Sequence, residues 1–484
     1  MENQATVINV ADSLEHENAM TKESRKIREN FQVFGLATFL YACFYAICMY
    51  KNDAGITCLL FVEAGLFYAN YCRKRLELPV KKGTAFYVVS ILLLGISTFC
   101  TDDARIILFN KTGVFLLMMS MILYNVFETK SWGLGKYLTA LIQSVLWSIG
   151  EWPCLFFDGR SFCKNKLGSK GKTVLYAVIS VLVSIPVCII VLKLLMSADA
   201  VFGHMTNKLL DNINFYNVTG ILFQIIAMFF CTYGILSYVA KREIKEETEE
   251  GRKGEPILAI PMAGILTALY LVFSVVQIAG LFLGKLSVPE GYTYAAYARE
   301  GFFQLLAVSI LNLVLVLVGM QFFKENRVLK LLLTLMSLCT FIMIASSTMR
   351  MVLYIRTYHL TFLRILVLWS LLVLAVLFAG VIINLYKKQF SLFRYSVVVV
   401  TVCYLGLSFA HPDYWIAKYN VAQRETIILM DESYLHELSA DAAPVLVPYF
   451  EMEEAERQWK IEDADSIRKF NISRFIAKRL LENK

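Results

Sequence analysis

Residues 54–100 read AGITCLLFVEAGLFYANYCRKRLELPVKKGTAFYVVSILLLGISTFC. Two apolar runs, 54–72 and 84–100, flank a short gap that holds five basic residues, Arg73, Lys74, Arg75, Lys81 and Lys82. An apolar run of this length crosses the roughly 30 Å hydrocarbon core of a bilayer as a helix, which satisfies its own backbone hydrogen bonds there. Because basic residues collect on the cytoplasmic side of membrane helices, the gap is predicted to be a cytoplasmic loop between two spans.

The same pattern repeats along the chain of 484 residues, of which 57% are hydrophobic. This composition is typical of the membrane class rather than of soluble globular proteins. We expect about eleven transmembrane helices, near residues 31–50, 54–72, 84–100, 106–127, 174–196, 218–240, 257–283, 301–323, 328–348, 362–386 and 394–410. The predicted fold class is all-α, a polytopic helical membrane bundle with a small C-terminal extracytoplasmic α-helical region.

The basic residues set the expected orientation. Before His411, every second gap holds most of them, 27 in all, against 10 on the other side or at span ends there. The positive-inside rule then predicts a multi-pass cell-membrane protein with a cytoplasmic N-terminus and an extracytoplasmic C-terminus. An excess of basic charge confined to loops is an orientation signal, so we expect the lipid bilayer as a partner and no nucleic acid.

The expected regions are a cytoplasmic, disordered N-terminus over 1–30, a transmembrane helical domain over 31–410, and an extracytoplasmic helical tail over 411–484. Within the second region, 132–153 is apolar enough to be a twelfth span. A crossing there would put Arg160 and four following lysines outside, so we predict an interfacial or re-entrant helix. In the tail, Pro412 suits a first helical turn, Asp431 and Asp441 are expected as N-caps, and 466–481 is expected to be a final basic helix.

Glu63 lies in the middle of the second expected span. A carboxylate at mid-bilayer costs roughly 2.5–3.5 kcal/mol on insertion scales, so it has to face the bundle interior, a partner or water, or be protonated. It is either a proton or cation site, or a neutral acid hydrogen-bonded to a neighbouring helix.

Two clusters at outer span ends are candidate ligand-binding residues. Arg350, Tyr354 and Arg364 form the first; Arg350 and Arg364 would share a helix face if the helix were continuous, and arginine forks suit phosphate or carboxylate. Snorkelling and pairing with external acids is the alternative. The second cluster comprises Tyr294, Tyr297 and Arg299 and is either an aromatic belt or a substrate platform.

No catalytic constellation, metal site or cofactor motif is expected. The eleven cysteines contain no Cys-x-x-Cys pair, and the spacing of the histidines matches no ligand pattern. The pair Asp102 and Asp103 resembles the external acid of polyprenyl-sugar transferases, but those enzymes carry it in a long first external loop, which is tiny here.

A family resemblance rests on the tail: His411-Pro412-Asp413, Ile416-Ala417, Tyr419-Asn420, Asp431, Tyr434-Leu435, Leu438-Ser439 and Asp441-Ala442-Ala443-Pro444. Residues 197–202, 291–306 and 350–364 add further blocks. Over roughly residues 80–450 the chain resembles bacterial multi-pass membrane proteins of the domain-of-unknown-function 4173/4153 type. The family pattern has a glycine where His359 stands and an asparagine where His411 stands. The resemblance implies a bacterial, Gram-positive cell-membrane protein and brings no established activity.

The leading hypothesis for function is a non-enzymatic protein that binds or moves an anionic lipid-like or small ligand at the outer face. One alternative is a membrane-embedded transferase or hydrolase acting on a lipid-linked substrate. Another is a sensor or assembly partner of a second membrane protein. Separate substitutions distinguish these hypotheses. A ligand-binding protein should respond to a change at Arg350, a transferase to one at Asp102 and a proton-coupled transporter to one at Glu63.

Overall fold

A computed structural model describes residues 20–129, 132–162, 215–242, 254–282, 294–387, 389–423 and 432–484, with isolated positions between 180 and 252. The chain forms two compact units. Unit 1 comprises Met1–Leu92, Val114–Thr129 and Leu138–Glu246, and unit 2 comprises Leu93–Gly113, Lys130–Tyr137 and Glu247–Lys484. Helices α5 (Thr84–Cys100) and α6 (Ala104–Val126) contribute to both units.

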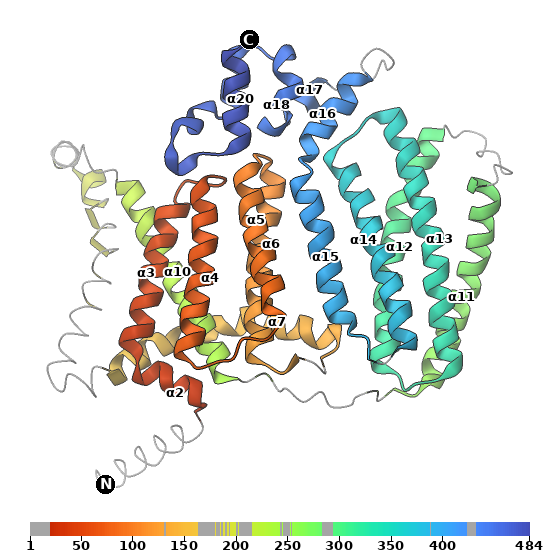
Figure 1. Ribbon diagram of the computed structural model, residues 1–484, viewed down its shortest axis with the longest axis horizontal. Coiled ribbons are helices and arrows are strands. Elements are labelled where there is room, and N and C mark those ends of the chain that lie inside the picture. Colours follow the sequence, from red (N-terminus) through yellow and green to blue (C-terminus); the bar gives the residue numbers. More distant parts are fainter. Residues whose placement is uncertain are drawn as a thin grey trace, which may run out of the picture. The chain divides into compact units, whose positions relative to one another are not determined.

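Unit 1 is built on three long helices that lie side by side in Figure 1, α3 (Phe31–Met49), α4 (Ile56–Arg75) and α10 (Phe215–Lys241). A short polar helix, α2 (Lys22–Glu29), precedes them, and Thr21 caps its first turn by accepting from the backbone N–H of Ser24. The core of the unit packs Ile27 of α2 against Phe34 of α3 and Tyr233 of α10.

Helix α7 (Leu134–Gly150) runs crosswise at one end of the unit 1 helices in Figure 1. A bend of 54° separates it from a second helix, Trp152–Phe162, which continues to the end of α3. Gly234 permits close packing, because a Cβ there would meet the Ser148 carbonyl oxygen at 2.4 Å. Lys241 pairs with Glu151 at 2.7 Å, and Tyr233 donates to Asp158 at 2.8 Å. Whether 132–153 is interfacial or re-entrant stays a prediction.

Unit 2 holds five long helices, α11 (Pro256–Gln277, continued by the π-turn η2, Ile278–Phe282), α12 (Tyr294–Phe322), α13 (Arg327–Tyr358), α14 (Phe362–Tyr386) and α15 (Leu392–Phe409). Helix α13 packs against α11, α12 and α14, which makes it the centre of the unit. Its 32 residues extend over about 48 Å, more than a hydrocarbon core needs. Asn312 donates to Thr340 at 3.0 Å and so joins α12 to α13 by a buried polar contact.

The prediction of an all-α membrane bundle is confirmed. Among the described residues, eight helices are long and apolar enough to cross a membrane, or nine if the bent pair counts as one span. Two expected spans within the described residues are not among the eight. Helix α5 is shorter, with 17 residues, and α4 carries Glu63, Asn70 and a basic end. The expected span over 174–196 lies mostly outside the described residues, so the number eleven stays a prediction.

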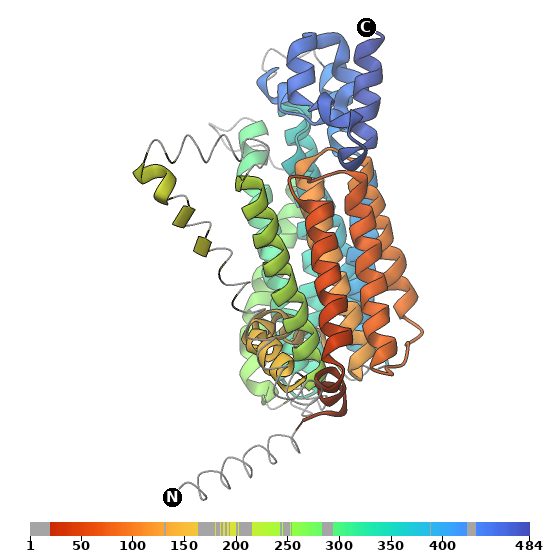
Figure 2. The ribbon, with the colours of Figure 1, turned by 90° about the vertical axis from the view of Figure 1, so that its left-hand side faces the viewer.

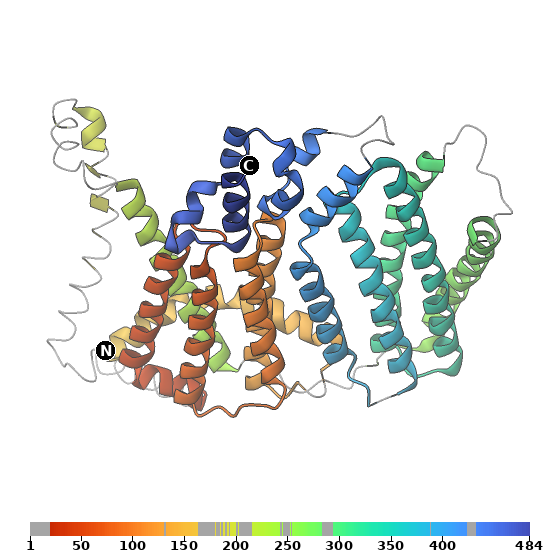
Figure 3. The ribbon, with the colours of Figure 1, turned by 45° about the horizontal axis from the view of Figure 1, so that its top comes forward.

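The tail consists of short helical segments, shown in dark blue beyond the end of α15 in Figures 2 and 3. They are α16 (Pro412–Ala422), α17 (Glu432–His436), η3 (Ala440–Ala442), α18 (Ala443–Leu446), η4 (Val447–Tyr449), α19 (Met452–Gln458), η5 (Ile461–Asp465), η6 (Ile467–Lys469) and α20 (Ile472–Glu482). Fully buried Trp459 fills their core and donates from its indole N–H to the Leu438 carbonyl at 3.2 Å. Ile106 of α6 and Phe362 of α14 belong to the same core, so the tail packs on the membrane helices of unit 2.

Pro412 opens α16 as expected. The prediction of Asp441 as an N-cap was wrong, because its carboxylate bonds to the α5–α6 loop instead. The final helix begins at Ile472 rather than near 466, where Asn471 caps it by accepting from Ser473 and Arg474. Asp431 lies outside the described residues.

Candidate functional site

Arg350 lies on α13 and is only 6% exposed. Its Nη2 donates to the Gln277 side-chain oxygen of α11 at 3.2 Å, and Ser346 donates to the same oxygen at 2.7 Å. Gly301 of α12 leaves room for the guanidinium, because a Cβ there would come 2.1 Å from Nη1. Arg350 is therefore enclosed by α11, α12 and α13, with a neutral amide among its partners.

Arg364 does not continue the face of Arg350, because α13 ends at Tyr358 and α14 begins at Phe362. Its guanidinium donates to the carbonyls of Tyr358 and His359 and stacks 4.5 Å from the ring centroid of Tyr354. A cation on the last carbonyls of a helix stabilises the C-terminus. Arg364 thus caps the C-terminus of α13, and the Tyr354 ring packs against its guanidinium.

The turn between these helices strains His359. Its φ of 67° and ψ of 179° fall in a region that is essentially restricted to glycine. The side chain is 5% exposed, and neither ring nitrogen has a hydrogen-bond partner among the described residues. Burial lowers the pKa of His359, and the charge of Arg364 acts in the same direction. The imidazole is therefore held neutral.

The second predicted cluster is described only by its backbone. Helix α12 begins at Tyr294, so Tyr294, Tyr297 and Arg299 occupy its first two turns. Their side chains lie outside what the structure describes.

Glu63 is exposed on the surface of α4 and does not point into the helices around it. It lies about 10 Å along the helix from Ile56 and about 15 Å from Arg73, close to the middle of the span that the sequence predicts over 54–72. Among the described residues, no group makes a hydrogen bond or ion pair with its carboxylate.

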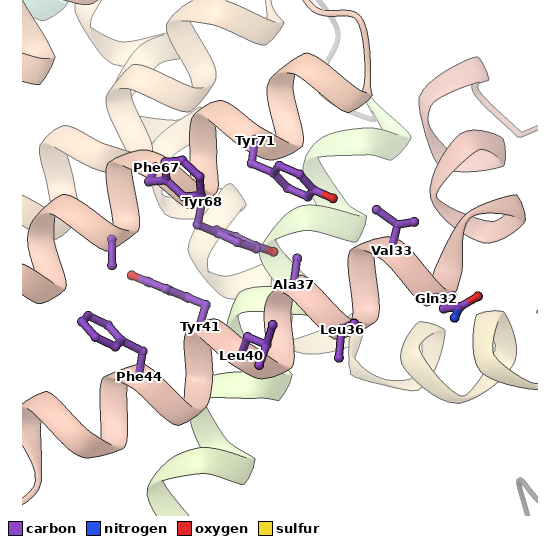
Figure 4. A pocket seen from close by; sticks show the side chains of 11 residues that line it. Gln32, Val33, Leu36, Ala37, Leu40, Tyr41, Phe44, Phe67, Tyr68 and Tyr71 are labelled. Atoms are coloured by element: carbon purple, nitrogen blue, oxygen red, sulfur yellow. The ribbon is translucent and has the colours of Figure 1, made fainter.

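A groove beside Glu63 runs between α3 and α4 (Figure 4). It encloses about 580 Å³ and is lined by Gln32, Val33, Leu36, Ala37, Leu40, Tyr41, Phe44, Ala64, Phe67, Tyr68 and Tyr71. Tyr41 and Tyr68 stack with ring centroids 5.0 Å apart, and the Tyr68 hydroxyl lies 2.7 Å from that of Thr38. At the basic end, the guanidinium of Arg75 lies 5.5 Å from the Tyr71 ring centroid.

A dense charged cluster joins the α5–α6 loop to the tail within unit 2. Asp103 caps α6 by accepting from the backbone N–H of Arg105 at 2.9 Å, and the Arg105 guanidinium returns to both of its oxygens at 2.8 and 2.9 Å. Arg105 also pairs with Asp413 of α16, which accepts from the backbone and hydroxyl of Ser439 at 2.9 and 2.8 Å. The Arg105 guanidinium lies 4.0 Å from the ring centroid of Phe362.

The other half of the cluster centres on Asp102 and Asp441. Asp102 accepts from Arg474 of α20 at 2.7 Å, and Arg474 also reaches Asp463 at 3.3 Å. Asp441 accepts from Thr101, from the Asp102 backbone at 2.8 Å, and lies 3.0 Å from His411 Nδ1.

Burial controls the protonation of these carboxyls. It raises the pKa of Asp102 to about 6, although Arg474 acts against the rise. Burial and the neighbouring Asp103 also raise the pKa of Asp413. Burial alone would raise the pKa of Asp441, but its hydrogen bond with His411 brings that pKa below the ordinary value. The same bond raises the pKa of His411.

This tail cluster, defined as Thr101, Asp102, Asp103, Arg105, His411, Asp413, Asp441 and Arg474, is a set of mutually satisfied charges. Asp102 is 9% exposed at its side chain, so it serves as the partner of Arg474 rather than as an acid facing a substrate. The sequence indicated Asp102 and Asp103 but not their partners, because more than 300 residues separate the pairs. The tyrosines of the groove were also missed, although Tyr68 and Tyr71 recur at helical spacing.

A family model for a domain of unknown function, DUF4153, matches residues 88–449. The chain belongs to this family. No curated protein and no solved structure matches it. The matched DUF4153 region includes the α5–α6 loop, the long helices of unit 2 and about the first half of the tail. Helices α3 and α4 with their groove precede it, and α19 to α20 follow it.

The backbone is unusual at the two positions where the resemblance implies a glycine and an asparagine. His359 and His411 both have positive φ, 67° and 47°. Glycine and asparagine are the residues that adopt this left-handed region most readily. The glycine and asparagine that the resemblance implies would therefore suit these backbone turns.

Proposed function

We propose that this protein is a membrane protein that binds a second membrane-embedded molecule laterally, within the plane of the bilayer, through the face formed by α3 and α4. The observation that carries the proposal is the outward position of Glu63 beside the groove of Figure 4. A carboxylate at this depth is costly when it faces hydrocarbon, so intramembrane acids are placed where a partner or water meets them.

The groove supports the same conclusion. Its volume lies within the range of about 300–1,000 Å³ that is usual for ligand sites. The stacked rings of Tyr41 and Tyr68 make a rigid wall, and Gly65 leaves space for the Tyr41 hydroxyl, which a Cβ would approach to 2.9 Å. A preformed concave surface reduces the entropy lost on binding.

Filling the groove tests this proposal. Ala64→Trp should displace the bound molecule, whereas Leu269→Trp, on the exposed side of α11, should not. The full-length protein is extracted from its own membrane in polymer-bounded lipid discs, and the co-isolated molecules are measured by mass spectrometry. A component that is retained by the parent and by Leu269→Trp but lost from Ala64→Trp supports the proposal. Identical contents in all three samples contradict it.

Anionic-ligand binding at Arg350 is the second candidate. A guanidinium enclosed near the end of a membrane helix, with the amide of Gln277 as a partner, is placed to attract phosphate or carboxylate. Arg350→Lys keeps the charge and loses the planar fork. The variant should insert normally but retain less anionic lipid in native mass spectrometry. Equal retention would leave Arg350 as an anchor.

For localisation, we propose a cell-membrane protein whose N-terminus is cytoplasmic and whose tail is extracytoplasmic, supported by the split of basic residues. In a cysteine-free background, an impermeant thiol reagent added to intact cells should label Glu453→Cys and spare Lys74→Cys. The opposite labelling would reverse the orientation.

A further inference from the structure

One face of α4 carries a stripe of five exposed residues, Leu60, Glu63, Phe67, Asn70 and Lys74. They follow one another by three and four residues in turn, which is the spacing of a seam between two packed helices. Phe67 is 72% exposed and also lines the groove. The stripe and the groove therefore form one continuous surface, which we call the α4 face.

We infer that the α4 face docks a single transmembrane helix of another protein, and that this helix carries a lysine or arginine near its middle, opposite Glu63. The inference rests on the proposed function and names the class of partner. In the hydrocarbon, a cationic side chain lowers the cost of a carboxylate, and a helix is the backbone conformation that can deliver one at this depth.

Two other occupants meet the charge of Glu63 less well. A lipid places its charges in the headgroup, and the basic end of α4 at Arg73 is about 15 Å along the helix from Glu63. A second copy of the chain that packed face to face would bring a second Glu63, and like charges at close range repel. Charge complementarity therefore favours a different protein with a basic residue.

The surroundings of Glu63 suit a helix. Ala37 and Ala64 are small residues on the facing walls of the groove, and small residues let helix backbones approach closely in membranes. Toward the basic end, the Asn70 side-chain oxygen accepts from Arg73 at 3.2 and 2.8 Å, so it is already used within α4. Lys74 is a cation, so Glu63 is the group in the stripe that selects a cationic partner.

Photo-cross-linking in native membranes tests this inference with a matched control. A benzoylphenylalanine replaces Phe67 in the full-length protein, and in a second full-length variant it replaces Phe223 of α10, which is also 72% exposed. We expect a discrete protein adduct at position 67 and none at 223. Glu63→Gln should reduce the adduct at least about tenfold, because it removes the charge while keeping the size.

The adduct is then identified by mass spectrometry, and a charge swap completes the test. Glu63→Lys should abolish cross-linking, and exchanging the partner's intramembrane Lys or Arg for Glu should restore it. An adduct that persists in Glu63→Gln, or one that joins two copies or two segments of this chain, overturns the inference but leaves lateral binding intact. Lipid adducts alone at position 67, with no lipid displaced by Ala64→Trp, overturn the proposed function as well.

Discussion

The tail cluster and the α4 face treat charge in opposite ways. In the tail cluster, Asp413 and Asp441 are buried, and the side chain of Asp102 is 9% exposed. Each of the three accepts hydrogen bonds from a cation, a hydroxyl or a backbone N–H. On the α4 face, Glu63 is exposed in the middle of a predicted span, and no described residue pairs with it. The charges of the tail cluster are therefore paired within one chain. Under the proposed function, Glu63 is paired by a bound partner molecule.

The difference separates a structural role from a binding role. Removing one member of a buried ion pair leaves the other charge uncompensated, which typically costs about 3–5 kcal/mol. Removing an exposed side chain that touches nothing changes stability by about 0.5 kcal/mol or less. Substitutions in the two regions should therefore differ sharply in their effect on the isolated protein.

The largest effect is expected in the tail. Arg474→Leu leaves Asp102 and Asp463 without their shared cation and should lower the stability of the docked tail by about 3–5 kcal/mol. Limited proteolysis in lipid discs would detect early release of α18 to α20. Arg479→Leu, on the exposed side of the same helix, is the matched control and should release nothing. Equal protease resistance of the two variants would show that the cluster does not hold the tail.

His359 lies between the two cases, since it is buried but unsatisfied among the described residues. His359→Gly removes a strained left-handed residue and should raise stability by about 1–2 kcal/mol. His411→Gly relieves a similar backbone but loses the bond to Asp441, so it should lower stability. Thermal unfolding of both variants in lipid discs checks the pair. A loss of stability in His359→Gly would indicate that the His359 imidazole has a hydrogen-bond partner that is not among the described residues.

The pH dependence of tail docking is a smaller effect. Burial gives Asp102 a pKa of about 6, above its ordinary 3.8, so the docked state binds a proton more tightly and gains stability as pH falls. The raised pKa of His411 acts in the same direction, because its contribution is present at low pH and lost as pH rises through the raised value. The lowered pKa of Asp441 opposes docking only below its ordinary 3.8.

Docking should therefore strengthen by about 1–1.5 kcal/mol from Asp102 alone between about pH 8 and about pH 5. Hydrogen exchange of α20 amides, corrected for the intrinsic rate at each pH, measures the change. Asp102→Asn should remove much of this pH dependence of tail docking. Stronger docking at the higher pH would contradict the assignment.

The sequence predicted the membrane helices well because an apolar run long enough to span a bilayer has few alternatives to a helix. The expected 31–50 and 362–386 correspond to Phe31–Met49 and Phe362–Tyr386. It could not predict which side of α4 Glu63 faces, because a membrane helix is apolar all round and amphipathic periodicity no longer reports the buried side. Nor could it predict the tail cluster, since Asp102 and Arg474 lie 372 residues apart in the sequence.

The most direct test of this account is the unfolding free energy of purified, full-length Glu63→Gln in lipid discs, compared with the parent and with Arg474→Leu. If Glu63 has no partner within its own chain, the variant should unfold within about 0.5 kcal/mol of the parent, while Arg474→Leu loses several times more. A loss of about 3 kcal/mol or more in Glu63→Gln would mean that its carboxylate is already paired inside the chain, and the α4 face would lose its basis as a binding surface.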